Sequence, residues 1–152
     1  MSLLFTIIPL IAQTNDEYAI ALEVRSEGVE IQRVDTQEWI ALPRRAVTPI
    51  GVGDTVRILR DGRASMQFTQ ASSMLLLPGS EYLVETLEQD GDAETVHLSF
   101  SGVSILNMSD IDNFRLSGRT ITVTDVNGVA GFWSDDLSDD AVAVTVGSGT
   151  ME

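Results

Sequence analysis

The sequence has 152 residues, of which 43% are apolar and 21% charged, a composition typical of one folded domain. Nine Lys plus Arg residues stand against 23 Asp plus Glu residues, giving a formal charge of −14. This charge repels nucleic acid and anionic membrane surfaces at long range, so we predict no nucleic-acid partner. The absence of cysteine excludes disulfides, thiolate metal sites and cysteine nucleophiles.

An apolar run over residues 3–12 lies near the start of the chain and is too short for a membrane-spanning helix of about 20 residues. It has the length of a signal-peptide hydrophobic region but lacks the basic residues that precede one. Two interpretations stay open: residues 1–14 are a retained targeting segment, or they form an apolar edge strand. As a strand, Phe5, Ile7 and Ile8 would pair with a sheet edge of the same or a neighbouring chain, giving an oligomer.

From residue 18 onwards, short runs alternate apolar and polar residues, which is the period of a strand with one buried face. Pairs such as Asp61-Gly62, Pro78-Gly79 and Ser101-Gly102 favour tight turns between the runs. We predict an all-β domain over residues 18–147, with short antiparallel strands in a sandwich or a coiled, solenoid-like arrangement, and a flexible tail at 148–152. The predicted strands include residues 29–32, 64–68, 81–88, 96–100, 103–105, 121–124 and 142–146.

The middle third carries three segments in a specific order: Gly53-Asp54-Thr55-Val56-Arg57, then Asp61-Gly62 followed by residues 63–68, then Leu75-Leu76-Leu77-Pro78-Gly79-Ser80. Together they resemble the central signature of the FecR domain of bacterial extracytoplasmic proteins. The resemblance covers about residues 22–146, although residues 128–133 depart from the Arg-Gly-Thr-like segment of that family. By turn chemistry we expect Asp54 to cap backbone amides before a strand and Gly79 to adopt the left-handed conformation.

The resemblance implies a bacterial, extracytoplasmic module that senses or binds a protein or cell-envelope component. FecR regulators of iron uptake also have an anti-sigma segment and a membrane helix, and this sequence contains neither. We therefore expect a standalone or excised module. A structural subunit that self-assembles through its apolar N-terminal strand is an alternative, and a calcium-dependent or carbohydrate-binding domain is a third.

Residues suited to catalysis are few, and we predict that the protein is not an enzyme and carries no cofactor apart from a weak calcium candidate. The single histidine, His97, lies between Val96 and Leu98 in an alternating run, and we expect it to point away from the core. One histidine without cysteine leaves little for a triad or a zinc site. No Gly-x-Ser-x-Gly motif supplies a nucleophile.

One acidic cluster has recognisable ligand chemistry, because calcium prefers several oxygen ligands. Its spacing differs from that of an EF-hand loop, so a solvated acidic loop and a weak calcium site both stay open. The cluster comprises Asp135, Asp136, Asp139 and Asp140.

Large aromatic residues offer a second kind of candidate. Phe132 and Trp133 precede the acidic cluster and would lie on opposite faces of a strand, either as packing residues or as a binding surface. Trp39 is expected in the core.

Overall fold

The computed structural model describes residues 19–90, 93–118, 122–124, 127–134 and 142–150. All its regular elements are strands, and no described segment forms a helix that could cross a membrane. The strands are β1 Ile20–Val24, β2 Val29–Gln32, β3 Trp39–Leu42, β4 Val47–Ile50, β5 Thr55–Ile58, β6 Ala64–Gln67, β7 Ser73–Leu76, β8 Glu81–Asp90, β9 Ala93–Met108, β10 Asn113–Ser117, β11 Thr122–Thr124, β12 Asn127–Ser134 and β13 Val142–Thr150.

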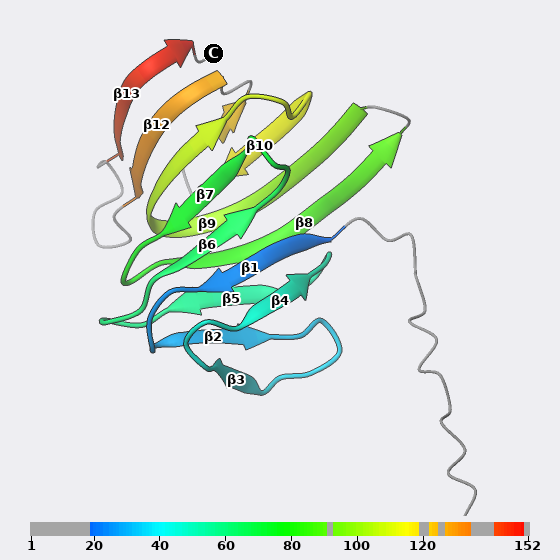
Figure 1. Cartoon of the computed structure of the whole chain (residues 1–152), viewed down its shortest axis with the longest axis vertical. Helices are drawn as coiled ribbons and strands as arrows, with labels where there is room; N and C mark the ends of the chain where they lie inside the picture. The colour runs from blue at the N-terminus through cyan, green and yellow to red at the C-terminus, as the bar shows by residue number, and fades with distance from the viewer. Residues whose placement is uncertain (1–18, 91–92, 119–121, 125–126, 135–141, 151–152) are drawn as a thin grey trace, which may run out of the picture.

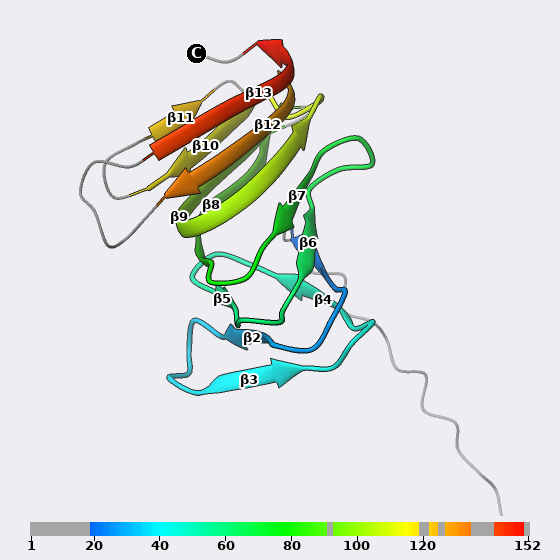
Figure 2. The same cartoon turned by 90° about the vertical axis from the view of Figure 1, so that its left-hand side faces the viewer.

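The strands form one curled sheet, shaped as a half-barrel (Figure 1). Strand β9 belongs to both of its halves. Half A runs β4-β1-β6-β7, the C-terminal part of β9, then β12 and β13. Half B runs β3-β2-β5-β8, the N-terminal part of β9, then β10 and β11. Figure 2 shows β12 and β13 at one end of the molecule and β2 and β3 at the other.

The pairing is antiparallel throughout the described strands except between β9 and β10, which are parallel. The all-β prediction with antiparallel strands is thus confirmed. The parallel pair arises because residues 109–112 carry the chain back from the end of β9, so that β10 lies beside the start of that strand. Phe114 of β10 then packs edge-on against Phe68, with ring centroids 5.8 Å apart.

The core lies on the inner face of the curled sheet, where alternate strand residues are buried. In β1 these are Ile20, Leu22 and Val24, and the other strands of both halves contribute in the same way. Among the largest buried side chains, Tyr82 stacks on Phe100 with ring centroids 6.4 Å apart. Burial of these alternate side chains is the main favourable free energy for folding, at about 25 cal/mol per Å² of apolar surface.

The predicted turn at Ser101-Gly102 is wrong, because β9 runs through it without a break. Gly102 has φ +105, and a Cβ at this position would lie 2.6 Å from the Cα of Ser80. The glycine therefore bends the strand at the point where it leaves half B and enters half A. The two short strands predicted at 96–100 and 103–105 are parts of one long strand.

The other predicted strands are found, including the one at residues 81–88, which is β8. Strand β13 continues to Thr150, so residues 148–150 do not belong to a tail as predicted. Gly149 pairs with Gly128 of β12, and this backbone pairing holds a segment whose composition alone suggests flexibility.

Candidate interaction surface

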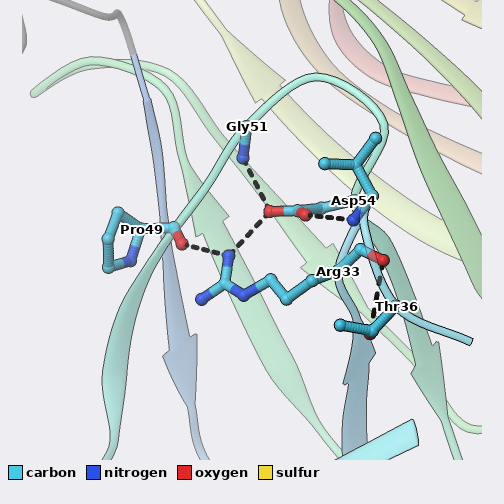
Figure 3. Close-up of polar contacts among 6 residues, drawn as sticks. Arg33, Thr36, Pro49, Gly51 and Asp54 are labelled. Atoms are coloured by element: carbon cyan, nitrogen blue, oxygen red, sulfur yellow. Dashed lines mark hydrogen bonds and ion pairs between the residues drawn. The ribbon is translucent and has the colours of Figure 1, made fainter. Parts of the chain in front are cut away.

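A buried carboxylate ties together two loops of the N-terminal region (Figure 3). The Asp54 side chain accepts hydrogen bonds from the backbone N–H of Gly51 at 3.0 Å and of Val34 at 3.1 Å. It also accepts one from Arg33 Nη1 at 2.6 Å, and the same nitrogen donates to the Pro49 carbonyl at 2.9 Å. Asp54 is only 4% exposed. The carboxylate is thus fully engaged in holding the loops that flank β2, β4 and β5.

The expected capping role of Asp54 is confirmed, since its carboxylate binds the Gly51 amide just before β5. Its additional partners, Arg33 and the Val34 amide, come from the loop after β2. Gly79 also has the left-handed conformation expected of it, with φ +82. These motif residues position loops and strands.

The outer face of half B carries a second charged contact next to Trp39. Arg57 Nε donates to Glu30 Oε2 at 2.5 Å across β5 and β2, and the Arg57 guanidinium lies 4.0 Å from the Trp39 ring centroid. The prediction that Trp39 belongs to the core is therefore wrong. Its neighbour Ile40 is opposite the buried Ile31, which places Trp39 on the other face of the strand.

Strand β3 is an open edge of the sheet. It pairs with β2, and no other described strand pairs with it. Its four residues, Trp39-Ile40-Ala41-Leu42, are all apolar, yet none of them is buried, and Ile40 is 47% exposed. An edge strand presents unpaired backbone N–H and C=O groups. Strand β3 therefore offers backbone hydrogen-bonding groups together with apolar side chains.

Strand β4 is the edge at the other end of the strand path, and it differs from β3 in one respect. It contains Pro49, which has no backbone N–H to donate. Proline on an edge strand weakens its ability to recruit another strand. Val47 in this strand is 67% exposed. The β3 and β4 edges thus differ in their capacity for strand addition.

Most of the residues predicted as sites lie outside the part of the chain that the structure describes. This is true of Phe5, Ile7, Ile8 and the acidic cluster at Asp135, Asp136, Asp139 and Asp140, so the N-terminal strand and the calcium site stay predictions. Phe132 and Trp133 are in β12, where their backbone pairs with Ser104 and Val103 of β9. Across the described ranges, no group of three or more acidic or histidine side chains could hold a metal ion.

His97 points away from the core as predicted, since Val96 and Leu98 on either side of it are buried. It is nevertheless half-buried on the outer face of half B, between Thr86 of β8 and Arg115 of β10. Its Nε2 atom is buried and has no hydrogen-bond partner among the described residues. His97 is therefore less exposed to solvent than a typical surface side chain, although it lies on the outer face.

A further polar cluster links the loop between β6 and β7 to the end of β9. Asp110 Oδ1 accepts hydrogen bonds from Thr69 Oγ1 at 2.5 Å and from Ser72 Oγ, and these bonds lower the pKa of Asp110. The buried Ser72 hydroxyl also accepts from the Ser109 amide at 3.0 Å. These contacts fasten the loop to the strand, and the sequence motifs gave no signal of them.

No known family model matches the chain, and comparison with curated proteins and with solved structures finds no significant similarity.

Proposed function

We propose that this protein is a non-catalytic, FecR-like interaction module that acts outside the cytoplasm and binds an extended segment of a partner protein along the edge of β3. The observation that carries the proposal is the exposed apolar edge strand Trp39–Leu42. Strand addition uses main-chain hydrogen bonds for affinity and side-chain pockets for specificity. The extracytoplasmic location follows from the resemblance to FecR domains.

The chemistry around β3 indicates what the partner segment contains. Ile40 presents an exposed apolar side chain on one face of the strand, where Leu42 packs partly against the core, and Trp39 presents its indole on the other face. Arg44 and Arg45, just beyond the strand, are exposed and form no ion pair with a described carboxylate. A complementary segment therefore alternates apolar residues and carries acidic residues at one end.

The neighbouring contacts hold this edge in place before a partner arrives. Arg57 packs on Trp39 and pairs with Glu30, while Asp54 fixes the start of the loop that leads from β2 to β3. A pre-organised edge loses little conformational entropy when a partner binds. The polar groups of this region thus support an edge that is ready for pairing.

The test is selection of peptides from a displayed library of random sequence against the wild-type protein. Selected peptides should bind an Ile40→Lys variant about tenfold or more weakly, because a charged residue on the edge opposes apolar strand addition. A Val47→Lys variant is the matched control on the β4 edge and should bind as wild type does. Amide hydrogen exchange should slow in Trp39–Leu42 when the peptide is bound.

The proposal fails if the selected peptides bind both variants equally or if the protected amides lie outside β3. It also fails if size measurement shows that the wild type already forms oligomers that Ile40→Lys dissociates, because the occupant of the edge is then a second copy of the chain. Thermal melting of each variant should show the wild-type transition, which checks that the fold is retained.

A further inference from the structure

Four loops that connect half A to half B lie together at one end of the molecule, on the left-hand side of Figure 1 and facing the viewer in Figure 2. The strand registers require this arrangement, because Val24 is opposite Ala64 and Val29 is opposite both Leu42 and Ile58. We call this region the arginine end. It consists of residues 25–28, 43–46, 59–63 and 77–80.

Positive charge is concentrated at the arginine end. All nine basic residues of the chain are arginines, and five of them lie in these loops, accompanied by two carboxylates, Glu27 and Asp61. In a protein with 14 excess negative charges, a local excess of positive charge opposes the general trend. The five are Arg25, Arg44, Arg45, Arg60 and Arg63.

Three of these arginines line one open pocket of about 520 Å³. The pocket is formed where the connections β1–β2, β5–β6 and β7–β8 meet, and each connection contributes at least one residue. Its lining consists of Arg25, Ser26, Arg60, Asp61, Arg63 and Pro78.

The pocket arginines are weakly neutralised by the protein itself. Within the described part of the chain, Arg60 and Arg63 form no ion pair, and Arg25 has only a 3.8 Å contact with Glu23 in which both side chains are more than half exposed. An exposed pair of this kind contributes little. Arg33 and Arg57, by contrast, pair with carboxylates at 2.6 and 2.5 Å. The pocket therefore retains its positive charge.

The two loops beneath the pocket pack closely against each other. Gly62 lies so close to Gly28 that a Cβ on Gly62 would be 2.2 Å from the Gly28 carbonyl oxygen. Close packing of the two loops holds the arginines of one next to those of the other. Three hydrogen bonds add to this, from Arg25 N to Arg63 O at 2.9 Å, from Leu59 N to Gly28 O at 2.8 Å and from Ser26 Oγ to Asp61 O at 2.9 Å.

We propose that this pocket binds a tetrahedral oxyanion, a phosphate or sulfate group. Three arginines and the Asp61 carboxylate leave two positive charges, which match the charge of a phosphate or sulfate dianion better than that of a single carboxylate. Guanidinium groups bind such oxygens through paired, charge-assisted hydrogen bonds. This site is separate from the β3 edge, so either proposal can fail while the other holds.

The test is isothermal titration of the wild-type protein with inorganic phosphate and, separately, with inorganic sulfate at constant ionic strength. At least one of the two anions should bind. The anion that binds more tightly shows whether the pocket prefers a phosphate or a sulfate group. The double variant Arg60→Gln with Arg63→Gln should bind about tenfold or more weakly because it loses two charge-assisted contacts. The single variant Arg25→Gln, which changes the arginine of the other loop, should also weaken anion binding.

Arg115→Gln is the matched control, because Arg115 is an exposed arginine in β10 and does not line the pocket. Its affinity should equal that of the wild type, and each variant should show the wild-type melting curve. The proposal is overturned if neither anion binds, if Arg115→Gln weakens binding as much as the double variant does, or if acetate binds as tightly as phosphate and sulfate.

Discussion

Ionisation of Tyr82 should destabilise the fold in alkaline solution. The Tyr82 side chain is fully buried, and its hydroxyl donates to the Val103 carbonyl at 2.9 Å. Burial raises the pKa of Tyr82 to about 12, and the nearby polar side chains of Ser80 and Ser104 partly oppose this rise. Because the folded-state pKa lies above the unfolded value, the resulting stabilisation is complete below pH about 10 and is lost as the pH rises through about 12.

The size of this loss follows from the two pKa values. Each unit of pKa difference corresponds to about 1.4 kcal/mol, so the free energy of unfolding should fall by about 1.4 kcal/mol by pH 11 and by about two to three kcal/mol above pH 12. A Tyr82→Phe variant cannot ionise there. Below pH 10 this variant should be less stable than wild type by roughly 0.5–1 kcal/mol, because Ser80 Oγ still donates to the Val103 carbonyl when the tyrosine hydroxyl is gone.

The assay is urea unfolding of both proteins at pH 9 and at pH 11. The chain suits it, because it contains no lysine, no cysteine and only two tyrosines, and few other groups titrate in this range. The stability difference between wild type and Tyr82→Phe should vanish or reverse at pH 11. Near-ultraviolet phenolate absorbance should show a late step that the variant lacks. If the stability difference between the two proteins stays constant from pH 9 to 11, ionisation of the buried Tyr82 does not destabilise the fold.

Three further changes test individual contacts. Asp110→Asn should melt below wild type near neutral pH, and because hydrogen bonds lower the folded-state pKa of Asp110, the two melting curves should converge as the pH falls below about 4. Asp54→Ala should lower the free energy of unfolding in urea by about 3 kcal/mol, since it leaves two backbone amides without their acceptor and Arg33 without its carboxylate partner, whereas Asp54→Asn should cost less. Gly102→Ala should destabilise by about 2 kcal/mol or more, while Gly51→Ala, with open space around its Cβ, should be nearly neutral.

Strands with a buried face were predictable from sequence because burial imposes a period of two. In β9, Val96, Leu98 and Phe100 are buried on one face and His97 lies on the other, as the alternation indicated. The same reasoning failed at Gly102, since a glycine can bend a strand without ending it. Whether the glycine bends or ends the strand depends on the close approach of Ser80, which lies 22 positions earlier. No local sequence pattern indicates that contact.

The edge strand shows a related limit. An apolar run such as Trp39-Ile40-Ala41-Leu42 is the pattern of a strand buried on both faces. The run lies at the edge because β2 is placed between it and β5, an order fixed by pairings of residues far apart in sequence. Trp39 is covered by Arg57 and not by the core, so an arginine two strands away decides the exposure of the indole.

The distribution of charge along the chain explains why a negative net charge does not exclude a site for a small anion. Residues 19–80 contain seven arginines and seven carboxylates, so the excess of negative charge comes almost entirely from residues 81–152, which hold fourteen carboxylates and two arginines. At physiological ionic strength exposed charges are screened beyond about 8 Å, and the field at the arginine end is therefore set by its own loops. A long polyanion would still meet the acidic part of the chain, whereas a single phosphate or sulfate group would meet only the pocket. The predicted absence of a nucleic-acid partner and the proposed oxyanion site are thus compatible.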